Sequence, residues 1–166
     1  TANEMTVTNI WMPSGALEVT GEGCDPAGHF EIHGQRCDYH NRADLTALLT
    51  TALICNHAKL TESDGIWQAA GEPTETALVV AAYKAWLAPQ EDQQPLSELS
   101  FNSDRKRMSV LVKGATDDVV TVHVKGAPEV LLPLCNRFRI GDDIAKLDAA
   151  ARQRIEQAYA DMTSKG

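Results

Sequence analysis

The run Lys125-Gly126-Ala127-Pro128-Glu129 predicts a corner between a strand and a helix. The residues before it, Val119 to Val124, are mostly β-branched, as is typical of strands. Pro128 and Glu129 suit a first helical turn, where a missing N–H is harmless and negative charge favours the helix dipole. The lysine and the two small residues after it therefore place a mobile cation at a corner that can face a ligand.

The strand pattern extends upstream of this corner. It predicts three strands, at Leu99–Phe101, Lys106–Lys113 and Val119–Val124. The last two are expected to form a hairpin across residues 114–118, a polar, Gly-containing stretch. Period-two spacing puts Lys106 in one row with Met108, so this lysine is either a solvated strand end or the lip of an apolar-floored pocket.

The remaining segments predict further strands, turns and helices. We expect strands at Met5–Met12 and Ala16–Thr20 joined by a Pro13-Ser14-Gly15 turn, a loop at Gly21–Asn41, helices at Ala43–Ala58, Pro73–Leu87 and Asp148–Met162, a short helix through Leu134, a strand near Phe138 and a turn at Asp142-Asp143. Asn41 or Asp44 is expected to cap the first long helix. The prediction is an α+β fold, an antiparallel twisted sheet flanked by helices, in one domain over residues 1–166.

Length and charge narrow the class of protein. A chain of 166 residues, 43% of them apolar, fits a single domain with its own core. Its 23 acidic and 15 basic residues give a net charge of -8, which disfavours nucleic acid as a partner. Any anionic ligand must then be held by local cations.

The sequence carries no membrane or export signal. No apolar run approaches the roughly 20 residues that span a bilayer, and the N-terminus lacks the pattern of a signal peptide, so we expect this chain alone to be soluble. The four cysteines show no close pairing, and reduced thiols in a cytosolic setting are expected.

Three motifs in this order resemble the nucleotide-binding domain of P-type cation-transporting ATPases. They are Gly71-Glu-Pro-Thr-Glu75-Thr-Ala-Leu78, Phe101…Arg105-Lys106…Met108-Ser-Val110 and Lys125-Gly-Ala-Pro-Glu129. The opening Thr1-Ala2-Asn3-Glu4-Met5-Thr6-Val7 resembles the segment that follows the phosphorylated aspartate of that family, so the resemblance covers the whole chain. It implies an excised middle piece of a larger membrane pump.

The resemblance also implies which residues surround the adenosine of ATP, bound with Mg²⁺. They are Glu75, Phe101, Lys106, Met108, Lys125, Gly126 and Ala127. Taken alone, Glu75 fits equally a charge at a helix N-terminus, Phe101 a core aromatic and the lysines a solvated surface. A ring for the base, a carboxylate for its amine and cations for the phosphates are the groups that such a pocket needs.

Two positions depart from the family pattern. Several ion pumps of the family place an arginine near the phosphates where this chain has Ser103, so this chain has no arginine at that position. A second family arginine normally follows a Lys-Gly pair like Lys165-Gly166 and would fall outside this chain. Weakened phosphate contacts are the expectation.

The chain lacks the groups for phosphoryl transfer. No phosphate-cradling Walker sequence is present, and the acceptor aspartate that the family implies would lie before Thr1. The resemblance therefore implies an enzyme only as a full-length ATP-driven cation translocase, with the phosphorylation and actuator domains of the same polypeptide as partners. The isolated domain is expected to be a cytoplasmic monomer that binds ATP without hydrolysing it, and its motifs are most similar to the calcium-pump-like group.

Two other functions compete with this interpretation. One is a non-catalytic interaction or regulatory module, with an acidic docking surface and a vestigial pocket. The other is a zinc-stabilised domain or zinc enzyme, because one polar loop holds five potential ligands: Cys24, His29, His33, Cys37 and His40. Their spacing fits no common zinc template, and we favour incidental loop chemistry.

Overall fold

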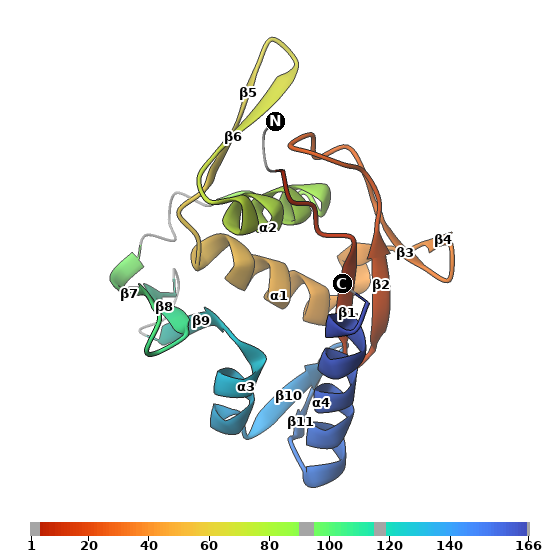
Figure 1. Ribbon diagram of the computed structural model, residues 1–166, viewed down its shortest axis with the longest axis vertical. Helices are drawn as coiled ribbons and strands as arrows, with labels where there is room; N and C mark the ends of the chain where they lie inside the picture. Colours follow the sequence, from red (N-terminus) through yellow and green to blue (C-terminus); the bar gives the residue numbers. More distant parts are fainter. Residues whose placement is uncertain (1–3, 90–94, 115–118, 166) are drawn as a thin grey trace.

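The computed structural model describes residues 4–89, 95–114 and 119–165 (Figure 1). Its elements follow in this order: β1 (Asn9–Met12), β2 (Gly15–Val19), β3 (Phe30–Ile32), β4 (Gln35–Arg36), η1 (Tyr39–Asn41), α1 (Ala43–Ile54), β5 (Lys59–Ser63), β6 (Ile66–Ala70), α2 (Pro73–Lys84), β7 (Pro95–Asn102), β8 (Arg107–Lys113), β9 (Val120–Gly126), α3 (Pro128–Leu131), η2 (Leu132–Leu134), β10 (Arg137–Ile140), β11 (Asp143–Lys146) and α4 (Ala149–Thr163). Helices and antiparallel strands are thus mixed along the chain, and the predicted α+β class is confirmed.

All the strand pairs in the described residues are antiparallel and join neighbours in the sequence. They form four sheets, ordered β1-β2-β3-β4, β5-β6, β7-β8-β9 and β10-β11. Short connections favour this arrangement, because an antiparallel pair needs only a tight turn whereas a parallel pair needs a long crossover. The predicted hairpin of residues 106–124 is present as β8 and β9, and its tip at 115–118 lies outside the described residues.

Helices α1 and α2 lie side by side at the centre, with the sheet β1–β4 on one side and β7–β9 on the other (Figure 1). The main core joins the first sheet to both helices, through Ile10, Met12, Leu17, Val19, Phe30, Leu45, Leu49, Ala81, Ala82 and Ala85. A second cluster joins the end of α1 to β8, through Cys55, Met108, Val110 and Val112. Helix α1 therefore contributes to packing on both of its sides.

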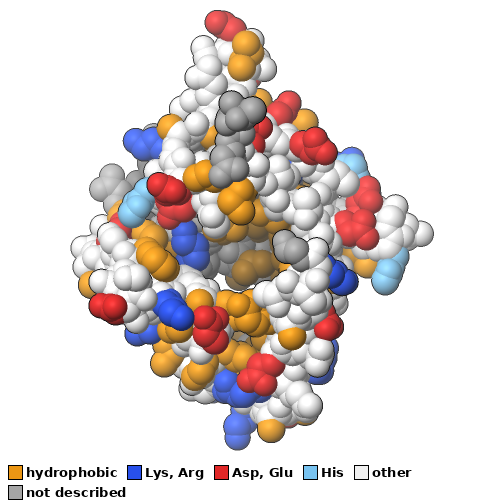
Figure 2. All heavy atoms as spheres, viewed as in Figure 1, with side chains coloured by type: hydrophobic (Ala, Val, Ile, Leu, Met, Phe, Trp, Pro, Cys, Tyr) orange, Lys and Arg blue, Asp and Glu red, His pale blue; other side chains and the backbone are white. Residues whose placement is uncertain are grey.

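The β5–β6 hairpin projects beyond α2, whereas α3, β10, β11 and α4 form the opposite end of the molecule (Figure 1). Figure 2 shows that this face is hollowed near its centre, with hydrophobic side chains around the hollow. None of the helices described is long and apolar enough to cross a membrane.

The prediction of a continuous loop at 21–41 is wrong. This segment contains β3, β4 and the short helix η1, and β3 buries Phe30 completely. The turn between the two strands has His33 and Gly34 in the left-handed region, with φ of 52° and 73°. Such two-residue turns match the twist of a hairpin, but a histidine in place of Asn or Asp hides the signal.

Two further hairpins were not predicted. β5 and β6 meet at Asp64 and Gly65, both with positive φ, and Asp-Gly is a strong hairpin signal that sequence reasoning could have used. β10 continues through a turn at Gly141 into β11, so Asp143 starts a strand instead of completing a turn. The predicted helices are all present, although α1 ends at Ile54 and α2 at Lys84, earlier than expected.

The carboxylate of Asp44 joins three separate turns at the N-terminal end of α1. It accepts hydrogen bonds from the hydroxyl of Ser14 in the β1–β2 turn, from Arg42 Nε at 3.2 Å and from the Gly141 N–H at 3.1 Å. The predicted cap is therefore wrong: the N-cap position is Arg42, which makes no side-chain capping bond. Asp44 instead holds the β10–β11 hairpin against the rest of the fold.

These contacts make Asp44 a buried but ionised group. The residue is 5% exposed, and burial alone would raise its pKa. Hydrogen bonds from Ser14, Arg42 and the Gly141 and Leu45 N–H groups outweigh this and lower its pKa to about 2. The junction thus stabilises the fold in its charged form.

Replacing Asp44 with Asn tests this junction. A folded-state pKa below the unfolded value gives stability that is complete at neutral pH and lost as the pH falls from about 4 toward 2. We expect Asp44→Asn to lower the free energy of unfolding at pH 7 by about 2 kcal/mol, and the difference from the parent to shrink over that acid range. Urea denaturation at several pH values measures both quantities.

Asp143→Asn is the matched control, because Asp143 is an exposed carboxylate on the same hairpin. It should leave the stability nearly unchanged at every pH. A loss for Asp44→Asn that is as large at pH 2 as at pH 7 would contradict the charge-based role of Asp44.

Candidate functional site

An ion pair joins the first turn of α2 to the end of β9. Lys125 Nζ lies 2.9 Å from Glu75 Oε1, although the two residues are 50 positions apart in the sequence. Helix α2 starts at Pro73, which suits the first helical position and leaves Glu75 in the first turn. The Lys125 side chain is 26% exposed and the Glu75 side chain 18%, so the pair is partly shielded from water and still accessible to a ligand.

Two residues just after α1 donate hydrogen bonds to Glu75. The backbone N–H of His57 donates to Glu75 Oε2 at 3.1 Å, and Asn56 Nδ2 donates to the Glu75 carbonyl oxygen at 2.9 Å. Burial would raise the pKa of Glu75, but hydrogen bonds from Lys125 and His57 bring the pKa below its ordinary value. At neutral pH the carboxylate is ionised and can only accept hydrogen bonds.

The β8–β9 ladder places a buried floor beneath the lysine. Met108 lies directly opposite Lys125 in the register and is 1% exposed. It packs with Cys55 at the end of α1. Burial raises the pKa of the Cys55 thiol, so this residue contributes packing in its protonated form.

The corner after β9 requires a glycine. The N–H of Ala127 donates to the Lys106 carbonyl oxygen at 3.1 Å, which draws the two chain segments together. A Cβ added to Gly126 would lie 2.5 Å from that oxygen and 2.6 Å from Arg107 Cβ, closer than these atoms can approach. Gly126 and Ala127 therefore let the chain after β9 pack closely against the turn at Lys106 that precedes β8.

The prediction that Lys106 continues the apolar row of β8 is wrong. The strand begins at Arg107, and Lys106 has a φ of 48° in a turn closed by its N–H to the Asn102 carbonyl oxygen. Its Nζ lies 3.7 Å from Glu129 Oε1 in the first turn of α3, and both side chains are more than half exposed. Lys106 thus lies at the outer edge of the corner, in a loose ion pair.

Phe101 presents its ring to solvent at the end of β7. Leu99 pairs with Ser109 and Asn102 with Arg107, so two residues of β7 oppose the single residue Met108. This irregularity has the form of a β-bulge, which re-aims a side chain. Phe101 is 63% exposed and does not belong to the core.

The seven predicted site residues are thus brought to one corner of the β7–β8–β9 sheet. Glu75 and Lys125 are in contact, Met108 forms the floor, Lys106 with Gly126 and Ala127 form the corner, and Phe101 lies in the bulge opposite Met108. An exposed ring, an acceptor carboxylate and two cations can bind a planar group that carries an amine and an anionic tail.

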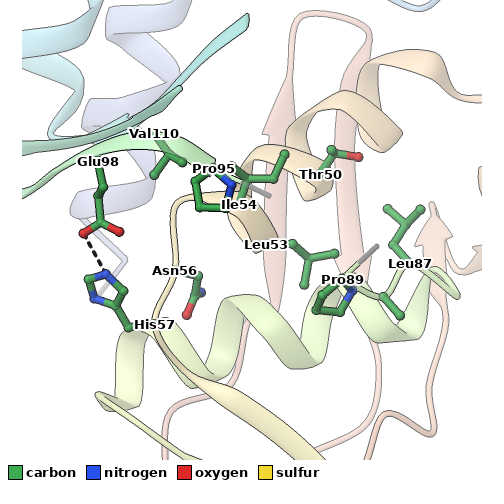
Figure 3. Close-up of a pocket in the computed structure, with 11 residues that line it drawn as sticks. Thr50, Leu53, Ile54, Asn56, His57, Leu87, Pro89, Pro95, Glu98 and Val110 are labelled. Atoms are coloured by element: carbon green, nitrogen blue, oxygen red, sulfur yellow. Dashed lines mark hydrogen bonds and ion pairs between the residues drawn. The ribbon is translucent and has the colours of Figure 1, made fainter. Parts of the chain in front are cut away.

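A separate cavity of about 350 Å³ lies between the end of α1, residues 87–89 and β7 (Figure 3). None of the seven predicted residues lines it. At its edge His57 Nε2 lies 2.8 Å from Glu98 Oε1, a hydrogen-bond contact that no sequence pattern indicated. The partners are 41 positions apart and lie outside the three motifs, so only the folded chain brings them together.

Three of the five potential zinc ligands in segment 24–40 contact other side chains. His29 pairs with Glu31 at 2.6 Å, Arg42 lies 3.9 Å from Cys37 Sγ, and His40 stacks on Tyr39. Within the described residues, no three His, Cys, Asp or Glu side chains lie close enough to hold a metal ion.

Comparison with known proteins identifies this arrangement. A family model described as "P-type ATPase, cytoplasmic domain N" matches residues 44–166. The chain is 31% identical to the Calcium-transporting ATPase of Bacillus subtilis over 168 residues, and 34% identical to the Probable cation-transporting ATPase F of Mycobacterium tuberculosis over 170 residues. The Cation-transporting ATPase pma1 of Synechocystis is 32% identical over 174 residues.

These matches cover 99% to 100% of this chain but only 18% to 19% of the relatives. The chain thus spans about a fifth of the length of the proteins that it resembles. The family resemblance that the three motifs predicted is confirmed over the whole chain. The chain belongs to the P-type ATPase family, as its cytoplasmic domain N.

Proposed function

We propose that this domain binds the adenosine of MgATP and presents the γ-phosphate to an aspartate on the phosphorylation domain of a P-type cation pump. The observation that supports it most directly is the exposed ring of Phe101 at the same corner as the Glu75–Lys125 ion pair. An aromatic of this size is normally buried, and its exposure here leaves a ring face free for a base.

Three side chains would recognise the adenine. Phe101 offers a stacking surface, and the ionised Glu75 accepts a hydrogen bond from the exocyclic amine. Lys125 holds the Glu75 carboxylate in place through its ammonium group, which can also donate to the ligand. Because Glu75 is bound on both oxygens before any ligand arrives, little ordering is needed on binding.

The phosphates would extend along the Lys106 side of the corner. Lys106 is loosely paired with Glu129, so it can turn to an anion with little loss. Ser103 is exposed in the turn before it, where several family members carry an arginine. We therefore expect weak, exchangeable binding, in the millimolar to micromolar range.

Magnesium would enter with the nucleotide. The phosphates of ATP are its natural oxygen ligands, and no protein metal cluster occurs in the described residues. The role of this chain is to bind and orient the nucleotide, and the acceptor aspartate belongs to another part of the pump.

The pump as a whole would couple this binding to ion transport. Hinged approach of domain N to the phosphorylation domain makes phosphoryl transfer effectively unimolecular. The relatives named as calcium- or cation-transporting ATPases support a calcium or related cation as the transported ion. In this proposal the domain is cytoplasmic and reaches the membrane only through the parent protein.

Phe101→Ala and Lys125→Ala test the site. Loss of the stacking surface should weaken adenosine and ATP equally, by a factor of roughly 5 to 100. Lys125→Ala should weaken ATP binding without unfolding the domain. Two-dimensional NMR titrations with adenosine and with ATP measure the affinities, and thermal unfolding checks the fold.

Leu96→Ala and Lys146→Ala are the matched controls, since Leu96 is an exposed apolar residue on β7 and Lys146 an exposed cation on β11. Both should bind as the parent does. Parent affinity in Phe101→Ala and Lys125→Ala would contradict the site. An absence of shifts at Phe101, Lys106 and Lys125 with millimolar ATP would favour a non-catalytic interaction module instead.

Ser103→Arg tests the missing phosphate contact. An added cation beside the phosphates should raise the affinity for ATP roughly two- to fivefold while leaving adenosine unchanged. Ser97→Arg adds the same charge elsewhere on β7 and should have a smaller effect. An equal gain in both variants would indicate general charge attraction, and no phosphate site near residue 103.

A further inference from the structure

We infer that the hydrogen bond between His57 and Glu98 positions the two walls of the nucleotide site relative to each other. The inference rests on the proposed function, because the walls in question are Glu75 and the strand that carries Phe101. Neither His57 nor Glu98 belongs to the three motifs. Both are positioning residues, since they act through other side chains.

His57 contacts both walls at once. Its backbone N–H donates to Glu75 Oε2 at 3.1 Å, and its side-chain Nε2 lies 2.8 Å from Glu98 Oε1 on β7 (Figure 3). Glu98 in turn accepts a hydrogen bond from the hydroxyl of Ser100 at 2.5 Å, the residue next to Phe101. One short chain of contacts therefore runs from the carboxylate to the neighbour of the ring.

Within the described residues, strand β7 pairs only with β8. It is an edge strand of its sheet, and all eight of its residues are exposed. The cavity beside the His57–Glu98 pair lies between β7 and the end of α1, and Leu53, Ile54, Val110, Pro95 and Glu98 are among the residues that line it (Figure 3). The backbone ladder to β8 sets the register of β7, and the His57–Glu98 hydrogen bond links the strand to the segment after α1.

Two carboxylates, Glu75 and Glu98, lie along this chain of contacts. A hydrogen bond from Ser100 lowers the pKa of Glu98, and the hydrogen bond with His57 lowers it further. Partial burial and the nearby charge of Glu75 act in the opposite direction, but the pKa stays below its ordinary value. Both carboxylates are thus anionic at neutral pH, and Lys125 neutralises only the one that it contacts. Removal of the His57 side chain would break the contact between Glu98 and the segment after α1, and β7 could then move away from Glu75.

The decisive experiment is a double-mutant cycle on the 166-residue chain, with adenosine as the probe and NMR titration as the measurement. Glu98→Ala should weaken adenosine binding about three- to tenfold, the size of coupling seen between residues in one network. Glu98→Gln keeps an acceptor for His57 and should restore most of the affinity. Glu62→Ala, an exposed carboxylate on β5, is the control and should have no effect.

The Glu75→Gln background separates positioning from a general effect on structure. There the added effect of Glu98→Ala should fall below about twofold, because the group that Glu98 positions through His57 is already altered. Inorganic triphosphate has no amine to donate to Glu75, so it should bind equally to the parent and to Glu98→Ala.

Parent-like adenosine binding by Glu98→Ala would overturn the inference, and so would an equal loss in both backgrounds. Each of these results leaves the proposed function intact, since the parent still binds. Failure of the parent itself to bind adenosine or ATP would instead overturn the proposed function and this inference together. The melting temperature of each variant, expected within a few degrees of the parent, confirms that the compared proteins are folded.

Discussion

The packing of helix α1 on both of its sides is the constraint on which the rest of the molecule depends. One side buries Leu45 and Leu49 with the first sheet and α2, and its C-terminal end packs through Cys55 on β8. These contacts hold two sheets that share no strand. Burial of this kind is the dominant favourable term in folding, so the relative position of the sheets follows from one helix.

A hydrogen-bonded carboxylate lies near each end of α1, and the two have different roles. At the N-terminal end Asp44 collects hydrogen bonds from three turns, and at the C-terminal end Asn56 and His57 hold Glu75. The first fixes the architecture, whereas the second places a charged group at the surface. In both, a carboxylate stays ionised near or beneath the surface because enough donors surround it.

The net charge of -8 limits how this domain could bind a nucleotide. An acidic domain does not attract polyphosphates at long range, so recognition must depend on local groups. Lys125 and Lys106 supply these at one corner, each already facing a carboxylate. In the proposed function, weak binding would suit a domain that loads and releases nucleotide in each cycle of the pump.

Sequence reasoning identified the family and the residues of the corner because each motif is local. Pro128 and Glu129 predict the start of α3, and the β-branched run before Lys125 predicts β9. It failed where the sequence signal was weak. The His33-Gly34 turn lacks the usual Asn or Asp, and the spacing of Lys106 fitted a strand although its positive φ places it in a turn. A single backbone angle cannot be deduced from a period of two.

The sequence by itself determined the mixture of helices and hairpins, the corner at residues 125–129 and the membership of the P-type ATPase family. Those features depend on neighbours within a few residues and on motif identity. Only the tertiary structure decided that Lys125 meets Glu75, that the bulge in β7 exposes Phe101 opposite Met108 and that His57 reaches Glu98. The reason is physical: these contacts join residues far apart in the chain, and their geometry is set by how α1 packs between the sheets.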